Sequence, residues 1–239
     1  MSNVITQVFQ QYRDLRLNGS KFFYYSYGKL DVRFQSIERD NYGSSIREAL
    51  GEGKFDLKVR VHFSELEDLF QTKRIQKRDI EKMKQDLIRN SHFEIVTDEI
   101  TDVFFIYERI SINTRQKYID VYFNEYAIIL HELTSGYPFT KIIFEDVMHL
   151  SSKYQINLYT YAMTILRKGG GIITRDIDDL REILAKDNNS DDYVFLNRFV
   201  TTPAKEISDN KDIGIVVNTK REGRNVHIRV NNKKEWNNG

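Results

Sequence analysis

One stretch decides the fold of the second half of the chain: residues 193–208, which read YVFLNRFVTTPAKEIS. Phe195, Phe199 and Ile207 recur in it at helical spacing, and polar or basic residues fill many of the positions between them. The spacing predicts a helical stretch over residues 193–208. One of its faces would pack into a hydrophobic core, and the opposite face would be free to bind a partner.

The proline inside this stretch predicts a local break. Pro203 has no backbone N–H and a fixed φ, so we expect it to start or kink a helical segment with Thr202 as the N-cap. That geometry would direct helix N–H groups, and the hydroxyls of Thr201 and Thr202, toward an anion such as a phosphate.

A hairpin is predicted to follow. Residues 213–218 and 226–230 are rich in Val and Ile and are interpreted as strands. Residues 219–225, TKREGRN, join them through a basic tip.

Two further helices are predicted before the stretch. The first begins at Ser151 or Ser152 and ends at the glycines of residues 168–171. After a short strand, the second begins at Thr174 or Asp176. Three helices followed by a hairpin is the order of a winged helix, a DNA-binding form of the helix-turn-helix.

The first half repeats this order from residue 55 onward. Alternating apolar residues predict a strand over 57–61, and Ser64 is the expected N-cap of the next helix. A basic connector, residues 73–78, leads to a second helix whose apolar face is predicted to contain Ile80, Met83, Leu87 and Ile88. After a strand beginning at 93–96, strands over 103–112 and 117–123 bracket a hairpin turn at 113–116.

The first residues of the chain are harder to interpret. Residues 4–17 are expected to form a short helix, and the aromatic cluster Phe22–Tyr27 is interpreted as a strand. Its aromatic rings are expected to pack in a core, with a stacking platform for bases as the alternative. The predicted fold class is α+β, with two tandem winged-helix domains joined near residues 134–148.

Composition excludes several classes of protein. The chain has 239 residues, 40% hydrophobic and 30% charged, which are ordinary globular values. It has no cysteine, so a disulfide framework, a thiolate metal site and a Cys nucleophile are excluded. The sequence shows neither a secretion signal nor an apolar run that could span a membrane. We therefore expect a cytoplasmic protein without disulfides.

The net charge of +1 hides a segregated distribution. Residues 73–92 contain seven basic and three acidic residues, and residues 93–150 contain four basic and ten acidic ones. Residues 151–239 contain fifteen basic and twelve acidic residues. Local potential governs binding to phosphates, so two basic segments favour a nucleic-acid partner, although basic runs can also be solvated helix faces.

Catalytic motifs are missing from the sequence. Residues 169–174, GGGIIT, lack the spacing and the lysine of a phosphate-binding loop. The five histidines are isolated, without the spacing of a metal site. Asp176, Asp178 and Asp179 are interpreted as acidic residues that favour a helix start rather than as Mg²⁺ ligands. We predict no enzyme activity, no cofactor and no metal.

The predicted DNA-binding residues follow from the two winged helices. The polar face of residues 193–208 offers Asn197, Arg198, Thr201, Thr202 and Lys205, and the hairpin tip offers Lys220, Arg221 and Arg224. The first half offers Lys73, Arg74, Lys77 and Arg78. The alternative for each group is a charged surface that only keeps the protein soluble.

The second half also resembles a known family. The residues that match are GYPFTK (136–141), LSSKY (150–154), LY (158–159), IDDLREIL (177–184), FLNRFV (195–200), PAKEI (203–207), KREGR (220–224) and VHI (226–228). On these residues the chain resembles the iteron-binding replication initiators of theta-replicating plasmids. Residues 55–135 match weakly, and the residues before Phe55 show no match.

The resemblance implies a function and partners. Residues 1–145 would form an N-terminal winged-helix domain with an N-terminal extension, used for dimerisation and DNA contact. Residues 146–239 would bind iterons, the short direct repeats of a plasmid origin. A monomer would start replication, and a homodimer would repress its own gene at an operator, for which an inverted repeat is the expected form. Host initiator and helicase-loading proteins would be partners.

The chain departs from the family pattern in one place. Family members often have two or three consecutive arginines before the second Phe of FLNRFV, where this chain has Leu196, Asn197 and Arg198. Only Arg198 matches, and Asn197 is expected to read an adenine instead. Two other functions fit the sequence: a winged-helix transcription repressor without a role in replication, and, less well, a metal-dependent nicking enzyme.

Overall fold

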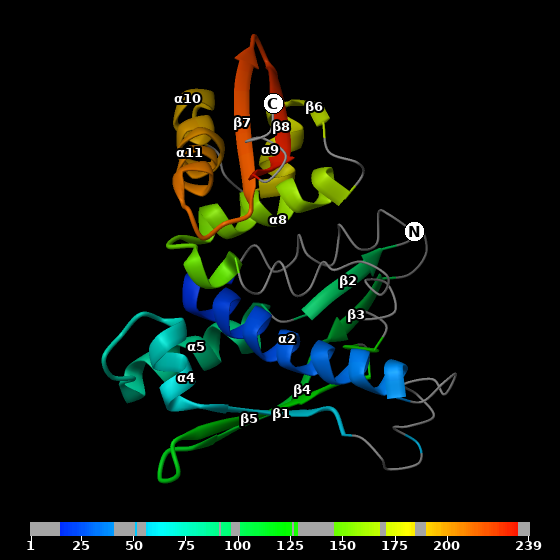
Figure 1. Ribbon diagram of the computed structural model, residues 1–239, viewed down its shortest axis with the longest axis vertical. Helices are drawn as coiled ribbons and strands as arrows, with labels where there is room; N and C mark the ends of the chain where they lie inside the picture. Colours follow the sequence, from blue (N-terminus) through cyan, green and yellow to red (C-terminus); the bar gives the residue numbers. More distant parts are fainter. Residues whose placement is uncertain are drawn as a thin grey trace. The chain divides into compact units, whose positions relative to one another are not determined.

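The computed structural model describes residues 15–40, 51, 56–90, 92–96, 101–125, 127–128, 146–167, 171–184 and 190–233. These residues form two compact units (Figure 1): an N-terminal unit within residues 18–144 and a C-terminal unit within residues 145–239, which also includes the described residues up to Leu17. In the described ranges, no helix combines the length and the apolar character needed to cross a membrane. The helix predicted over 4–17 and the hinge predicted over 134–148 fall mainly outside the described residues.

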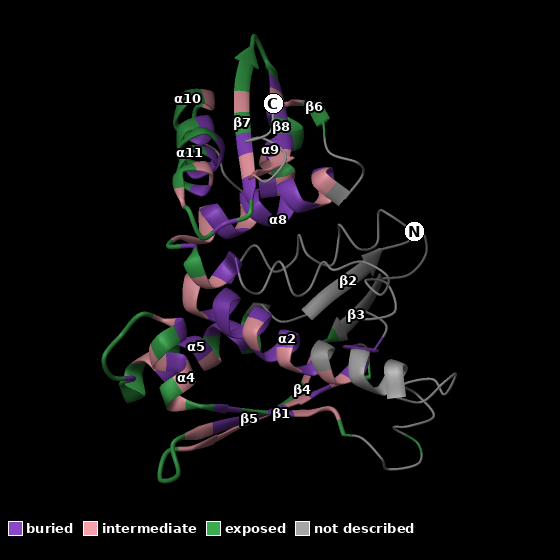
Figure 2. Ribbon diagram, in the orientation of Figure 1, coloured by how far each residue is buried: buried purple, intermediate pink, exposed green. Residues whose placement is uncertain are grey.

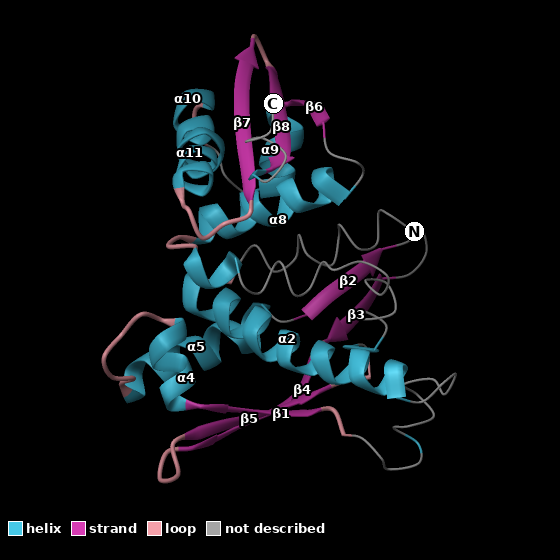
Figure 3. Ribbon diagram, in the orientation of Figure 1, coloured by secondary structure: helices cyan, strands magenta, loops and turns pink. Residues whose placement is uncertain are grey.

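In its described residues the N-terminal unit combines helices with two small antiparallel sheets (Figure 3). In chain order its elements are α2 (Leu17–Asp40), β1 (Lys58–His62), α4 (Phe63–Leu69), α5 (Lys77–Asn90), β2 (His92–Val96), β3 (Thr101–Phe105), β4 (Tyr107–Asn113) and β5 (Tyr118–Phe123). Strand β5 lies between β1 and β4 and is antiparallel to both, and β2 pairs with β3 in a separate antiparallel sheet.

The strand predicted over residues 103–112 is in fact two strands. The chain bends at Ile106, so β3 pairs with β2 while β4 pairs with β5. Ile106 is fully buried at the bend. No glycine or proline marks this position, so the sequence carries no turn signal at which the break could be predicted.

The aromatic cluster Phe22–Tyr27 is helical, so its interpretation as a strand is wrong. Phe23, Tyr27, Leu30 and Phe34 follow one another at intervals of four, three and four residues, and each is at most 1% exposed. The ring of Tyr27 lies 6.3 Å from that of Phe123 on β5, edge to face. Aromatic residues favour strands locally, but burial at helical spacing against the sheet decides the structure. The expectation that these rings pack in a core is confirmed.

Helix α4 begins two residues earlier than the sequence predicts. Its N-cap is His62, not Ser64, and the His62 backbone N–H donates a 2.6 Å hydrogen bond to Oε2 of Glu65. The other oxygen of Glu65 accepts hydrogen bonds from Tyr25 and Lys29 of α2. Glu65 therefore satisfies the helix start and joins two helices, a task that a serine at position 64 cannot perform.

The C-terminal unit repeats the order of elements. It consists of α8 (Lys153–Arg167), β6 (Gly171–Asp176), α9 (Ile177–Leu184), α10 (Asp192–Leu196), η2 (Asn197–Thr201), α11 (Thr202–Asp209), β7 (Ile215–Glu222) and β8 (Asn225–Asn232). Of the two caps predicted for α8, Ser152 is the one that forms, because its Oγ accepts the Gln155 N–H. Of the two predicted for α9, Asp176 is the one that forms, because its Oδ1 accepts the Asp178 N–H.

The two units share one sheet topology. In the C-terminal unit β8 lies between β6 and β7, as β5 lies between β1 and β4 in the N-terminal unit. Each unit therefore has a first helix, a strand, two more helical elements and a hairpin that pairs with that strand. This is the winged-helix arrangement predicted from the sequence, and the fold is α+β with two tandem copies.

The hairpin of the C-terminal unit is longer and tighter than predicted. Its strands run to Glu222 and restart at Asn225, so the turn consists of Gly223 and Arg224 alone. Gly223 has φ +64°, as the first central position of a type II′ hairpin turn requires. Lys220 and Arg221 therefore lie on strand β7, and only Arg224 of the three predicted cations is at the tip.

Candidate nucleic-acid interface

The helical stretch predicted over residues 193–208 is formed by α10, η2 and α11 in succession. Exposed and buried residues alternate along it two by two (Figure 2). The buried residues are Phe195, Leu196, Phe199, Val200, Pro203, Ala204 and Ile207. The exposed residues before Glu206 are Tyr193, Val194, Asn197, Arg198, Thr201, Thr202 and Lys205, and we call them the exposed stripe.

The π-helical segment η2 explains the four-residue repeat. In a regular α-helix each residue turns by about 100°, so a four-residue repeat drifts by about 40° per repeat. In η2 the Thr202 N–H bonds to the Asn197 carbonyl, five residues back, which places more residues in the turn. The extra residue keeps the exposed stripe on one side of the helix.

The predicted N-cap at Thr202 is wrong. The backbone is helical at Thr201 and Thr202, and no side chain caps α11. The Thr202 N–H bonds within η2, Pro203 has none, and Thr202 Oγ1 donates a 3.2 Å hydrogen bond to Oδ1 of Asn197. The wide turn of η2 accommodates the proline. The start of α11 therefore lacks the free N–H groups that were predicted to bind a phosphate at Thr202 and Pro203.

Aromatic rings pack behind the exposed stripe, and two of them contact Arg198. The rings of Phe195 and Phe199 stack at 5.3 Å, and Tyr154 of α8 meets Phe199 edge-on at 4.7 Å. The Arg198 guanidinium lies 4.7 Å from the centroid of the Tyr154 ring and 5.7 Å from that of Phe199. Tyr154 was missed in the sequence because it lies 44 residues from Arg198, and only the packing of α8 against the helix brings them together.

Arg224 at the hairpin tip is bound to carboxylates. It contacts Asp178 at 2.5 Å and Asp176 at 3.3 Å, both at the start of α9. The hydrogen bond to Asp176 raises the pKa of Arg224. The Asp178 N–H and Arg224 together lower the pKa of Asp176. We call this contact the tip latch, since it fixes the end of the hairpin against the helix.

The other two cations of the hairpin also have partners. Lys220 pairs with Glu222 at 2.6 Å, which raises the pKa of Lys220 and lowers that of Glu222. Arg221 donates from Nε to the Gly223 carbonyl and lies 3.7 Å from Asp192 on α10. Both cations are exposed, and Arg221 joins the hairpin to the start of the helix that bears the exposed stripe.

The predicted basic residues of the N-terminal unit are exposed on and before α5. Lys73 and Arg74 lie in the loop after α4, and Lys77 and Arg78 form the first turn of α5. Ile88 was predicted in the buried face but is 64% exposed, because it lies about 100° around the helix from the buried Leu87.

The outer side of α5 contains residues that the prediction missed. Arg78, Lys82, Gln85 and Arg89 follow one another at intervals of four, three and four residues and are all exposed. Helix α5 has the same place in the topology as the helix of the exposed stripe. The signal was present in the sequence, since a helix with a predicted apolar face also has a predictable opposite face.

The hairpin of the N-terminal unit also has a basic tip. Arg115 and Lys117 are exposed in the turn between β4 and β5. Asn113 orders this turn, because its Oδ1 accepts the Gln116 N–H at 2.8 Å. The sequence predicted the turn but not its charge as a candidate contact.

Cations on the sheet of the N-terminal unit are neutralised. Asp120 of β5 accepts two hydrogen bonds from Arg60, at 2.7 and 2.9 Å, and lies 2.9 Å from Lys58. Arg60, chiefly, lowers the pKa of Asp120 to about 2. The Arg60 guanidinium also stacks 3.7 Å from the centroid of the Tyr118 ring. These contacts stabilise the sheet rather than offering free charge to a phosphate.

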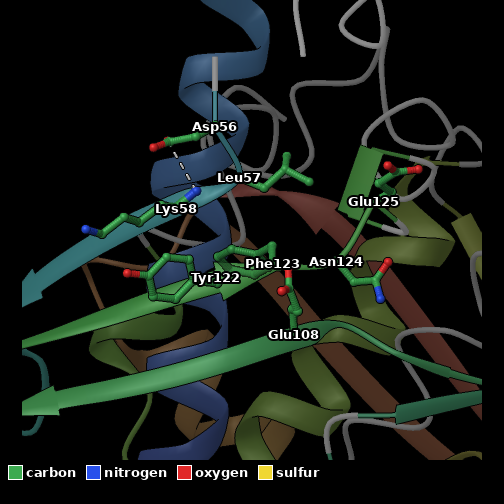
Figure 4. Close-up of a pocket in the computed structure, with 8 residues that line it drawn as sticks. All are labelled: Asp56, Leu57, Lys58, Glu108, Tyr122, Phe123, Asn124 and Glu125. Carbon is green, nitrogen blue, oxygen red and sulfur yellow. Dashed lines mark hydrogen bonds between the residues drawn. The ribbon is translucent and has the colours of Figure 1, made fainter. Parts of the chain in front are cut away.

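A pocket in the N-terminal unit lies at one end of the same sheet (Figure 4). It is lined by Asp56, Leu57, Lys58, Glu108, Tyr122, Phe123, Asn124 and Glu125. Three of these residues are acidic and the single cation pairs with Asp120, so the pocket does not suit a nucleic acid. Within the described ranges, no group of three or more metal-ligating side chains is gathered at one place.

Comparisons with known proteins agree with this geometry. Residues 1–163 match the family model described as Initiator Replication protein, WH1. The chain is similar to the structure of the Pi initiator protein in complex with iteron DNA, with a TM-score of 0.61 and 16% identity over 94% of this chain and 95% of that chain. It is similar to domains 2 and 3 of RctB, with a TM-score of 0.52 and 11% identity over 90% of this chain and 82% of that chain. No curated protein matches it significantly.

Proposed function

This chain belongs to the initiator replication protein family, and on that premise we propose that it binds direct-repeat DNA, the iterons, at a plasmid origin. Members of the family are DNA-binding initiators rather than enzymes. The observation that carries the proposal is the exposed stripe, whose polar and basic side chains from Asn197 to Lys205 lie on the third helical stretch of a winged helix. The Pi protein, whose structure contains iteron DNA, has the same fold, which supports the proposal.

In this proposal the C-terminal unit, residues 146–239, provides the sequence-specific contacts. Asn197, Arg198, Thr201, Thr202 and Lys205 face the major groove, where Arg pairs with guanine and Asn with adenine. The cations of the hairpin contact the phosphate backbone or the minor groove; they are Lys220, Arg221 and Arg224.

The N-terminal domain, residues 1–145, is proposed to provide a second DNA contact and the dimer contact. Its phosphate-binding residues are Lys73, Arg74, Lys77 and Arg78. Their exposure at the start of α5 supports this role. Two winged helices on successive turns of DNA would cover about 20 base pairs, since one turn contains about 10.5 base pairs.

The proposal extends to regulation and partners. The monomer starts replication in the cytoplasm together with host initiator and helicase-loading proteins. The homodimer binds the promoter of its own gene and represses it, which would limit the copy number of the plasmid. The family supports the role in replication, while the dimer and the host partners rest on the resemblance of the sequence.

Footprinting of the purified protein on the DNA that flanks its own gene tests the proposal. We expect protection of an array of direct repeats of about 20 base pairs. We also expect that a plasmid without the gene is lost unless the gene is supplied from elsewhere. Protection of a single inverted repeat, with normal maintenance after deletion, would instead identify a transcription repressor. Binding without sequence preference would contradict both.

A further inference from the structure

We infer that Tyr193 and Val194 recognise thymine in the repeat through apolar contact with its 5-methyl group. The inference rests on the proposed function and adds a feature of the DNA sequence that is recognised. It concerns two residues that the sequence-based assignment of the DNA interface left out.

The first observation is that both side chains are exposed although they are apolar. Tyr193 is 73% exposed and Val194 is 44% exposed. In the part of the chain that the structure describes, the other large apolar side chains with such exposure are Ile88, Phe105 and Ile172. Tyr193 and Val194 are the adjacent pair in this group, and together they form an apolar surface at one end of the exposed stripe.

The second observation is their helical phase. Tyr193 and Val194 precede Asn197 and Arg198 by four residues, about one helical turn, and all four are exposed, which places them on the same side of the helix. The core positions of this turn are filled by Phe195 and Leu196, which are buried. A surface that contacts DNA through Asn197 and Arg198 therefore includes the two apolar side chains.

The third observation is the place of the pair at the N-terminal turn of the helix. In helix-turn-helix proteins the N-terminal residues of the recognition helix reach the base edges. The two neighbouring carboxylates are engaged within the protein. Asp191 Oδ1 accepts the Val194 N–H at 3.0 Å, and Asp192 is bound by Arg181 at 2.9 Å and approached by Arg221 at 3.7 Å.

The chemistry of the major groove determines the partner. Each base pair presents hydrogen-bonding groups there, and thymine alone presents a methyl group. Val194 has no group that can hydrogen-bond to a base, and Tyr193 has such a group only in its hydroxyl, so the aliphatic side chain and the phenol ring can exclude water from a methyl. Burial of one methyl group corresponds to about a fourfold gain in affinity.

The test uses the protein's own repeat with single thymines replaced by deoxyuridine, which removes only the methyl group. For the wild-type protein we expect about a fourfold loss of affinity at one or two positions. For Val194→Ala or Tyr193→Ala we expect weaker binding to the natural repeat and no further loss at the position that each residue contacts. Ile172→Ala, which truncates a side chain on β6 that is 66% exposed, should keep the full deoxyuridine effect.

The outcomes separate the inference from the proposed function. If the wild-type protein prefers its repeat but is indifferent to every deoxyuridine, the inference is overturned while the proposed function stands. Repeat binding that both variants leave unchanged also overturns it, because the apolar pair then makes no contact with the DNA. Failure of the wild-type protein to prefer its repeat would contradict the proposed function itself. Because both side chains are exposed, truncation is expected to leave the thermal unfolding temperature unchanged.

Discussion

Arg198 contacts Tyr154 in two ways: its guanidinium lies over the phenol ring, 4.7 Å from the centroid, and its Nη2 donates a hydrogen bond to the phenol oxygen. The ring is in turn fixed by its edge-on contact with Phe199, which is only 6% exposed. An arginine that is already ordered loses less side-chain freedom when it binds. The arrangement identifies Tyr154 as a positioning residue for Arg198.

Removal of the Tyr154 ring should therefore weaken recognition. We expect Tyr154→Leu to cost about 0.5–1.5 kcal/mol of binding free energy toward the repeat, and Tyr154→Phe, which keeps the ring, to cost less. Fluorescence anisotropy with repeat and scrambled DNA measures both. In an Arg198→Ala background the leucine variant should cost nothing further, and an equal loss in that background would mean that Tyr154 acts by another route.

Arg198→Ala and Lys220→Ala should have different effects. If Arg198 contacts a base, its loss costs about 1–3 kcal/mol and relaxes the preference at one position of the repeat. Lys220→Ala should weaken binding to all sequences alike and reduce the slope of log K against log salt by about one. Affinities for a set of single-position variants at several salt concentrations distinguish the two. Unchanged affinity and preference in Arg198→Ala would show that the helix is assigned to the wrong role.

Opening the tip latch should strengthen electrostatic binding. Asp178→Asn removes the carboxylate 2.5 Å from Arg224 and leaves the guanidinium held by Asp176 alone, at 3.3 Å, so a phosphate can displace that carboxylate more easily. We expect tighter binding to any duplex and a salt slope steeper by about one. The matched control is Asp179→Asn, which removes the same charge from the same helical turn. An equal change in both variants would mean that only net charge matters.

The outer side of α5 gives a prediction for the N-terminal unit. The double variant Lys82→Ala with Arg89→Ala should reduce the salt slope by about two if both residues contact phosphates. Lys84→Ala is the control, because Lys84 pairs with Glu81 at 2.5 Å and is less exposed. An unchanged slope in the double variant would place α5 away from the DNA.

Asp120 predicts a dependence of stability on pH. Its pKa is about 2 in the folded protein and about 3.9 in an unfolded chain, so its charge stabilises the fold above pH 3.9. The contribution is lost as the pH falls through about 2. We expect Asp120→Asn to lower the free energy of unfolding by about 1–3 kcal/mol at pH 7, since Arg60 and Lys58 lose their partner. Urea unfolding should show that the difference from wild type shrinks between pH 5 and pH 2, and a constant difference would contradict the assignment.

Repeated patterns in the sequence predicted most of the architecture. The order of helices and strands in both units followed from apolar spacing, and the outward direction of Asn197, Arg198 and Lys205 followed from the inward direction of Phe195 and Phe199. These features depend on residues near one another in the chain, so the spacing of apolar residues in the sequence is enough to predict them.

Features that depend on distant residues escaped the prediction. Helix α2 forms because its aromatic side chains are buried against a sheet far along the chain, and local propensity pointed to a strand. Glu65, not Ser64, completes the start of α4 because Tyr25 and Lys29 come to it from another helix. The pairing of Tyr154 with Arg198 likewise requires the packed fold. In these cases tertiary contacts outweigh the local signal.

The π turn Asn197–Thr201 has a consequence for how the protein and its DNA can evolve. It keeps the row from Tyr193 to Lys205 on one side of the helix. The length of this row is about 18 Å, which corresponds to about five base pairs of DNA. Because the turn holds one residue more than an α-helical turn, deletion of one residue from it would leave an ordinary α-helical turn and keep both ends of the row on the same side of the helix. The π turn is therefore a position at which the helix can lose a residue while the side chains before and after it keep their directions.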